Sequence, residues 1–132
     1  NSAEDITIQD PFNVTINAHQ GYNICRVNQT CYVLAKEGDS YTSLSKTFAI
    51  SEQNLRKFND VNKQQTLRTG EIVFIERKKE SWHGELLFHT ARANESLHAV
   101  SQSYGIRLRR LARLNRLRPS ATLAADQKVR LR

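Results

Sequence analysis

The sequence is short of apolar residues, which make up 39% of its 132 residues. A chain of this length forms one ordinary domain or two very small ones, and the low apolar share argues against one large core. No apolar run approaches the about 18 residues that a membrane-spanning helix needs. The chain has no methionine and no signal-peptide pattern, so we expect a mature fragment or an expressed piece of a longer protein.

Cysteine is also scarce, with Cys25 and Cys31 as the only two. A disulfide across such a short loop is possible in an oxidising compartment, and two unpaired thiols are an equally good interpretation. The pair lacks the Cys-x-x-Cys spacing of many metal sites. We therefore predict no metal ion and no cofactor.

Catalytic signatures are missing as well. The four histidines, His19, His83, His89 and His98, form no His-Glu-x-x-His pattern. Glu37 with Asp39, or Asp60 with Glu71, could be proposed as carboxylate pairs for glycoside hydrolysis, but surface loops explain them better. Modules this small lack a deep cleft that could shift a carboxylate pKa. We predict a chain without catalytic activity.

Positive charge is concentrated in the second half of the chain. Residues 1–76 hold seven Lys or Arg against nine Asp or Glu, whereas residues 77–132 hold 13 against four. A basic surface attracts nucleic acid, acidic glycans or phosphate-rich envelopes. The alternative is a solvated face that serves solubility.

An internal repeat is the most informative feature of the sequence. A shift of 56 residues pairs residues 32–75 with residues 88–131 without a gap, and nine of these 44 pairs are identical. Apolar residues meet apolar residues at most of the other positions that a fold would need. Asn59 coincides with Asn115.

Each copy has the pattern strand–helix–helix–strand. In the first copy we predict a strand at 32–35, a turn at Gly38-Asp39-Ser40, and a helix from Tyr41 with one apolar face. Gly38 allows a positive φ, and Asp39 or Ser40 can cap the helix. A second helix over 52–59 and a strand over 72–75 complete the copy.

This arrangement resembles the LysM domain. The matching residues of the first copy are Tyr32-Val33, Lys36 to Ser40, Leu44-Ser45, Phe48, Ile50-Ser51, Leu55, Asn59, Leu67, Gly70 and Val73 to Ile75. The resemblance implies an α+β fold of two βααβ modules in tandem, each with both helices on one side of a two-stranded antiparallel sheet. We expect a β-rich segment or linker at 1–30, modules at 31–76 and 88–132, and a basic linker at 77–87.

The resemblance also implies binding of N-acetylglucosamine polymers, peptidoglycan or chitin, in a shallow groove between two loops. The first wall of this groove is Gly38, Asp39, Ser40 and Tyr41, and the second wall lies within 62–67. Our candidates on the second wall are Gln65, Thr66 and Leu67, with Leu67 or the Tyr41 ring as an apolar shelf.

The second copy should use Asn94, Glu95, Ser96 and Leu97 as its first wall. It carries Asn94, Glu95 and Asp126 where the first copy has Gly38, Asp39 and Gly70. Asn tolerates a positive φ better than most residues, whereas Asp126 is harder to place if its turn needs Gly. We therefore expect the first copy to make most of the sugar contact.

A finer resemblance concerns residues 102–108 and the basic run 77–79. They are similar to the C-terminal LysM region of cell-wall N-acetylglucosaminidases of Bacteroidetes-type bacteria. This implies the targeting part of a secreted, periplasmic or envelope-associated peptidoglycan hydrolase whose catalytic domain precedes the pair. The strand-like patterns at 6–8 and 12–17 would then pack on the first module or belong to a linker.

Two other classes of function compete with glycan binding. Six arginines cover the exposed face of the second helix of copy two: Arg107, Arg109, Arg110, Arg113, Arg116 and Arg118. They could bind the phosphates of nucleic acid or anionic envelope polymers. Nucleic acid is the less favoured partner because interleaved aromatic residues are missing. The third class is a purely structural spacer or protein-docking surface.

Overall fold

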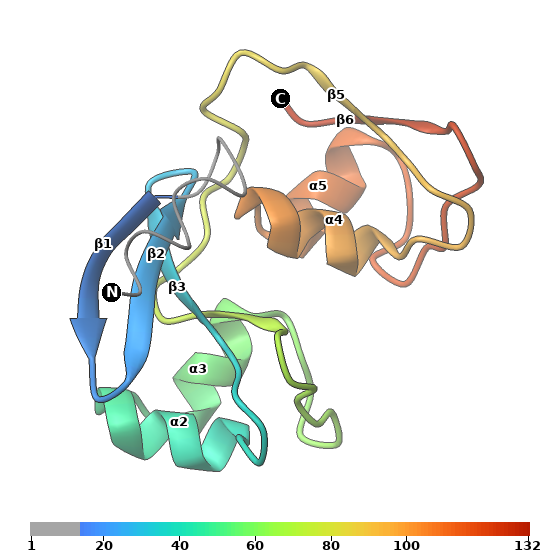
Figure 1. The fold of residues 1–132 in the computed structure, drawn as a ribbon. Coiled ribbons are helices and arrows are strands. Elements are labelled where there is room, and N and C mark those ends of the chain that lie inside the picture. The colour runs from blue at the N-terminus through green and yellow to red at the C-terminus, as the bar shows by residue number, and fades with distance from the viewer. Residues whose placement is uncertain (1–13) are drawn as a thin grey trace. The chain divides into compact units, whose positions relative to one another are not determined.

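The computed structural model describes residues 14–132, with side chains from Ala18 onward. The chain divides into two compact units, Asn1–Arg77 and Lys78–Arg132, each with its own sheet (Figure 1). The strand predicted at 6–8 lies outside the described residues. Within 14–132, no helix combines the length and the apolar character needed to cross a bilayer.

The first unit contains the predicted βααβ module. Strand β3 (Thr30–Leu34), helix α2 (Tyr41–Phe48), helix α3 (Glu52–Phe58) and strand β4 (Ile72–Phe74) follow in the expected order. β3 and β4 pair antiparallel with Val33 opposite Val73. The α+β architecture predicted from the repeat is confirmed.

A β-hairpin precedes this module and extends its sheet. β1 (Val14–His19) pairs with β2 (Tyr22–Val27), and β2 pairs with β3, so the strand order is β1-β2-β3-β4. The predicted strand at 12–17 corresponds to β1 and is displaced by two residues. The described part of the segment 1–30 is therefore ordered as strands of the first unit.

The hairpin settles the state of the two cysteines. Cys25 lies opposite Tyr32, and Cys31 lies opposite Arg26. Because successive residues of a strand point to opposite faces, the two thiols lie on opposite faces of the β2–β3 pair. Both cysteines are free, so the possible disulfide is not formed.

The core of the first unit lies between the sheet and its two helices. Val33 and Val73 of the sheet, Leu44 of α2 and Leu55 of α3 are fully buried in one cluster. The spacing of Tyr41, Leu44 and Phe48 brings one face of α2 onto this cluster. Helix packing on one face leaves the loops that connect strands and helices at the edge.

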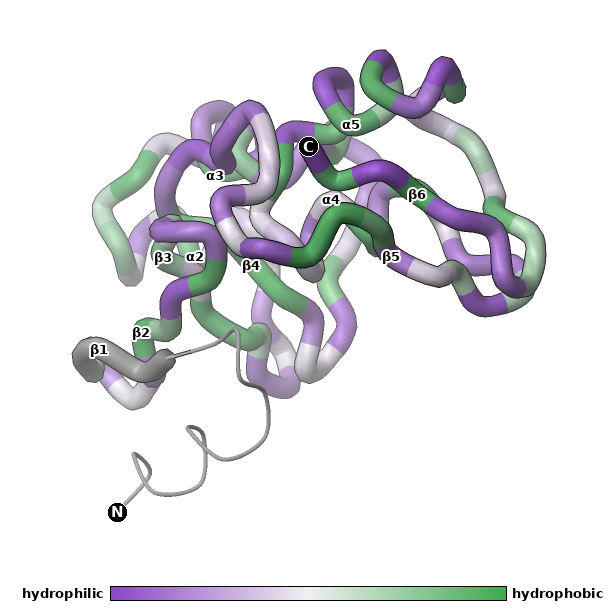
Figure 2. Tube along the Cα trace, turned by 90° about the horizontal axis from the view of Figure 1, so that it is seen from above, coloured by the Kyte–Doolittle hydropathy of each residue, from purple (hydrophilic) through white to green (hydrophobic). Residues whose placement is uncertain are grey.

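The second unit repeats this plan with a two-stranded sheet. Its elements are β5 (Phe88–Thr90), α4 (Leu97–Tyr104), α5 (Leu108–Leu114) and β6 (Lys128–Arg130). The tube in Figure 2 alternates between hydrophobic and hydrophilic residues along α5. Leu108, Leu111 and Ala112 form its buried side.

Residues 78–87, predicted as part of a linker, contribute to the second unit. Lys78 and Trp82 are buried, at 3% and 5% exposure. The Lys78 ammonium donates to the Gln102 side chain at 2.7 Å, and the Trp82 ring packs edge-on against Tyr104. The predicted module boundaries themselves stay predictions.

The repeat is visible in the backbone torsion angles. Four positions of positive φ recur at the same offset of 56 residues, as the pairs Gly38/Asn94, Ala49/Gly105, Asp60/Arg116 and Gly70/Asp126. Asn94 and Asp126 both have φ 66°, so both turns survive without glycine. The concern about Asp126 is resolved, because the left-handed region tolerates Asp and Asn best among the residues that carry a Cβ.

An asparagine side chain ties the second helix of each unit to its last strand. The Asn59 amide donates to the carbonyls of Leu55 and Phe74 and accepts from the Phe74 N–H at 2.7 Å. Asn115 makes the same three bonds with Leu111 and Arg130. Asn59 is fully buried, whereas Asn115 is partly exposed.

We predict that Asn59→Ala lowers the free energy of unfolding of the first unit by about 3 kcal/mol, since it strands buried main-chain groups of Phe74. Asn115→Ala should cost the second unit about half as much, because water can replace the lost bonds. Urea unfolding followed by circular dichroism measures both. Equal losses would contradict the role of burial in this difference.

Candidate functional site

The first wall is a corner that its own side chains hold in place. The Asp39 carboxylate accepts a hydrogen bond from the Lys36 N–H at 2.7 Å. Ser40 caps α2 by accepting from the Ser43 N–H, and the Ser43 hydroxyl accepts from the Ser40 N–H. The side chains of Asp39 and Ser40 are thus committed to the corner, which leaves main-chain groups as its binding groups.

Tyr22 of the hairpin braces this corner from outside the repeat. Its hydroxyl donates to both carboxylate oxygens of Asp39, at 2.8 and 2.7 Å, and the Lys36 ammonium lies 4.3 Å from the centre of its ring. Burial raises the pKa of Tyr22 to about 12, with further contributions from the hydrogen bond and the charge of Asp39. The hairpin therefore helps to fix the first wall.

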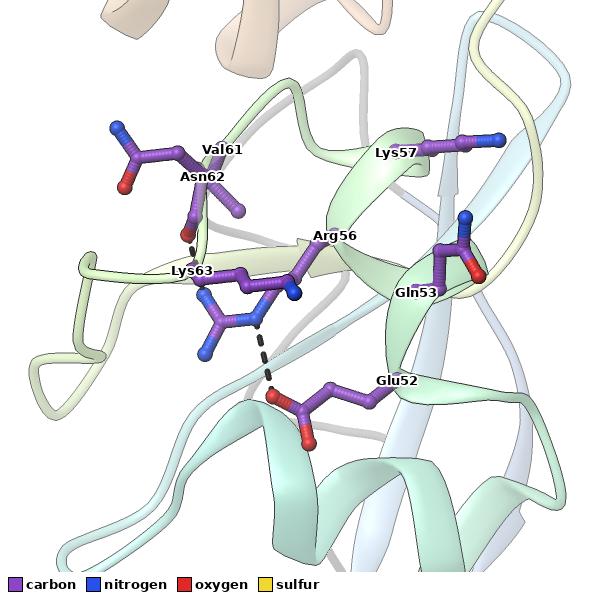
Figure 3. A pocket seen from close by; sticks show the side chains of 7 residues that line it. All are labelled: Glu52, Gln53, Arg56, Lys57, Val61, Asn62 and Lys63. Carbon is purple, nitrogen blue, oxygen red and sulfur yellow. Dashed lines mark hydrogen bonds and ion pairs between the residues drawn. The ribbon is translucent and has the colours of Figure 1, made fainter.

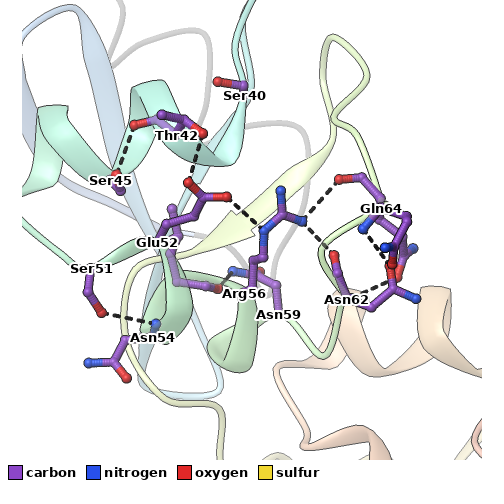
Figure 4. Close-up of polar contacts among 12 residues, drawn as sticks. Ser40, Thr42, Ser45, Ser51, Glu52, Asn54, Arg56, Asn59, Asn62 and Gln64 are labelled. Carbon is purple, nitrogen blue, oxygen red and sulfur yellow. Dashed lines mark hydrogen bonds and ion pairs between the residues drawn. The ribbon is translucent and has the colours of Figure 1, made fainter.

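The second wall, residues 62–67, is held by Arg56 of α3. The Arg56 guanidinium donates through Nη1 to the carbonyls of Asn62 at 2.6 Å and Gln65 at 3.0 Å. Its Nε donates to Glu52 at 3.1 Å, and Thr42 donates to the same carboxylate at 2.8 Å (Figures 3 and 4). Hydrogen bonds from Thr42 and Arg56 hold the pKa of Glu52 below its usual value.

Arg56 also contacts a residue of the first wall. Its guanidinium carbon lies 4.6 Å from the centre of the Tyr41 ring. That ring is 2% exposed and belongs to the core cluster, so it is not available as an apolar shelf. Leu67, which is only half-buried at the edge of the same cluster, remains for that role.

Main-chain groups of the first unit's two walls are left without hydrogen-bond partners. Among the described residues, none pairs with the N–H of Gly38, Tyr41 or Leu67, or with the C=O of Asp39 or Leu67. Both donors and acceptors are thus available at the two walls. We call these two walls, with their unpaired main-chain groups, the open groove.

In the second unit the same groups bond to one another across the groove. The Asn94 N–H donates to the Leu123 carbonyl at 2.9 Å, and the Leu123 N–H donates to the Glu95 carbonyl at 2.7 Å. The Leu97 N–H donates to the Ala121 carbonyl at 3.0 Å. An antiparallel bridge joins Ser96 to Thr122. We call this arrangement the closed groove.

The corner of the closed groove is braced from within its own module. Glu95 accepts from the Arg92 N–H at 3.0 Å and contacts His89 Nε2 at 2.9 Å, while His89 Nδ1 lies 3.0 Å from the Tyr104 hydroxyl. Burial raises the pKa of Glu95, but the bonds from His89 and the Arg92 N–H outweigh it and lower this pKa. His89 and Tyr104 thus take the bracing role that Tyr22 has in the first unit.

The predicted site residues therefore fall into two groups. In the first unit Arg56 contacts both the Tyr41 ring and the Gln65 carbonyl and so links the two predicted walls, whereas Asn94, Glu95, Ser96 and Leu97 of the second unit pair with residues 121–123 in the closed groove. Sequence reasoning missed Arg56 and Tyr22. The repeat carries a signal for Arg56, because Ala112 occupies the matching position. Tyr22 lies outside the repeat.

Metal chemistry has no candidate in the part of the chain from residue 14 onward. No three His, Cys, Asp or Glu side chains come together there in a group that could hold a metal ion.

Comparison with protein families gives a match over both units. The LysM domain family matches residues 34–76 and 89–132. No curated protein matches the chain. The spore cortex-lytic enzyme SleL of Bacillus cereus is 24% identical with a TM-score of 0.34, and that of Bacillus megaterium QM B1551 is 20% identical with a TM-score of 0.32. In both cases the match covers 76% of this chain and 22% of the enzyme.

We predict a loss of stability in alkaline solution that depends on Tyr22. A tyrosine whose pKa is about 12 when folded and 10.0 when unfolded stabilises the protein fully below pH 10 and loses this effect as the pH rises toward 12. Tyr41 has a pKa raised to about 12 as well, chiefly by burial. Tyr22→Phe should therefore flatten the decline without abolishing it.

Unfolding by urea at a series of pH values between about 8 and 12 measures this decline. The ultraviolet absorbance of ionised tyrosine offers a direct reading. An unchanged decline in the Tyr22→Phe variant would contradict the assignment.

Proposed function

Because the chain belongs to the LysM domain family, we propose that its first unit binds glycan that contains N-acetylglucosamine, with peptidoglycan as the natural polymer. LysM domains are modules that bind such glycans. The ligand would lie in the open groove, between residues 38–41 and residues 62–67.

The observation that carries this proposal is the set of unpartnered main-chain groups in the open groove. An acetamido group has one N–H and one C=O, and the N–H and C=O groups of the two walls complement both. Leu67, which is half-buried, supplies an apolar contact for the acetyl methyl or a sugar face. The closed groove has already used the corresponding groups, so the second unit should contribute little sugar contact.

The proposal extends to the protein that this chain serves. The chain would anchor a peptidoglycan hydrolase to the cell wall, and our candidate for this hydrolase is an N-acetylglucosaminidase. The hydrolase would be secreted or remain in the cell envelope. Support comes from the resemblance of residues 77–79 and 102–108. Binding modules without catalytic activity fit an anchoring role, because they keep a tethered enzyme at high local concentration near its polymer.

We predict that Gly38→Val weakens binding of N-acetylglucosamine oligomers several-fold, because a β-branched residue is strained at φ 84° and displaces the first wall. Gly70→Val is the matched control. Its φ of 87° imposes similar strain and neither glycine has an atom within 4 Å of an added Cβ. The Gly70 N–H, however, is already bonded to the Ala35 carbonyl.

Chemical shift titration with soluble oligomers measures the affinity and locates the ligand. The wild-type shifts should appear at residues 38–41 and 65–67. Shifts confined to residues 94–97, or equal weakening by the two valine variants, would contradict the placement of the sugar.

A second candidate function rests on the charge of the second unit. Within the described residues, Arg109, Arg113, Arg116 and Arg118 are exposed and have no acidic partner, whereas Glu80 pairs with Arg107 and Arg110. Uncompensated arginines on and beyond one helix attract anionic envelope polymers, and nucleic acid less specifically.

We predict that Arg109→Ala/Arg113→Ala reduces retention on an anionic envelope polymer at low salt and leaves oligomer binding unchanged. Raising the salt should release the wild-type chain from the anionic polymer, because exposed charges are screened over about 8 Å at physiological ionic strength. Retention on nucleic-acid-free peptidoglycan at high salt would remain. Equal salt sensitivity of both interactions would favour charge attraction as the main function.

A further inference from the structure

We propose that Arg56 is a positioning residue that keeps the groove of the first unit open. The biological meaning of this inference rests on the proposed function, whereas the geometry stands without it. The residue has no part in the predicted site. In the second unit, Ala112 occupies the position that corresponds to Arg56, and Leu108 the position that corresponds to Glu52. Neither side chain can form these hydrogen bonds.

One main-chain carbonyl of the second wall has a different hydrogen-bond donor in each unit. In the second unit the Ala121 carbonyl accepts the Leu97 N–H across the groove at 3.0 Å. In the first unit the matching carbonyl, that of Gln65, accepts the Arg56 guanidinium at 3.0 Å instead. The Tyr41 N–H, which corresponds to that of Leu97, is left without a partner among the described residues.

The guanidinium is the stronger competitor for this carbonyl. A hydrogen bond from a charged donor exceeds one between neutral groups. Arg56 also holds the neighbouring Asn62 carbonyl at 2.6 Å, and Glu52 fixes its Nε at 3.1 Å. Because three contacts and the Tyr41 ring hold the side chain in one position, Arg56 holds the Gln65 carbonyl and the loop around it in the open arrangement.

The two ends of the loop are anchored alike in the two units. The N–H of Val61 bonds to the carbonyl of Arg56 at 3.1 Å, as that of Leu117 bonds to Ala112 at 2.9 Å. At its other end, Glu71 accepts from the Arg68 N–H as Gln127 accepts from the Ala124 N–H. Since both ends of the loop are anchored alike, the difference between the open and the closed groove is local to the wall that Arg56 holds.

The test is amide hydrogen exchange of the whole chain, read residue by residue by NMR. In the wild type, the amides of Tyr41 and Leu67 should exchange quickly, while those of Leu97 and Leu123 are protected. Arg56→Met keeps the aliphatic volume of the side chain and removes its donors. It should slow the exchange of the Tyr41 and Leu67 amides by about tenfold, as the walls bond to each other.

Lys57→Ala is the matched control, because it removes the same charge from the adjacent position of α3. Its exchange should equal that of the wild type. Glu52→Gln keeps the shape of the Glu52 side chain and weakens its bond to Arg56, so it should slow the exchange of the Tyr41 and Leu67 amides by an intermediate factor. This variant replaces Arg56→Met if Arg56→Met folds poorly. Fast exchange at Tyr41 in both Arg56→Met and Glu52→Gln would overturn the inference.

Titration with N-acetylglucosamine oligomers separates this inference from the proposed function. If the groove binds sugar, Arg56→Met should weaken the affinity by about tenfold, because the closed state competes with the ligand. If the wild type binds no oligomer, the proposed function fails while hydrogen exchange still decides the role of Arg56. Wild-type affinity in Arg56→Met would overturn the inference.

Discussion

The properties of both units depend on where the main-chain N–H and C=O groups of two corners find partners. A folded chain leaves few such groups without a partner, because each unpaired group that is buried costs free energy. In the second unit the corners satisfy each other. In the first unit several of these groups have no partner among the described residues, so a ligand with both donors and acceptors could bond to them.

The supporting structure makes this difference possible without altering the fold. Each unit uses a capped first helix, an asparagine that joins the second helix to the last strand, and left-handed residues at the same four places. These caps, side-chain bonds and left-handed turns fix the ends of both walls. What remains variable is the short stretch between them, and there a single charged side chain can select one of two bonding patterns.

The hairpin adds a second layer of support that belongs to the first unit alone. Tyr22 bonds the carboxylate that shapes the first wall, so the corner is braced by a strand outside the βααβ module. The second unit achieves the same with His89 and Tyr104 from inside its module. A corner that presents its backbone to a ligand needs such bracing, because a mobile wall would lose binding free energy when it became ordered.

The sequence by itself determined the architecture, because apolar spacing, helix caps and turn residues act over short distances and recur in two copies. The two walls, and the first copy as the better candidate for binding, stay predictions from the sequence. Only the tertiary structure decided which groove is open, since the choice between a guanidinium and an amide for the Gln65 carbonyl depends on contacts from α3 that the loop sequence does not contain. It likewise decided that Tyr22 braces the site, that the Tyr41 ring is part of the core, and that the cysteines stay apart. Each of these follows from which face of a strand or helix a side chain occupies once the elements have packed.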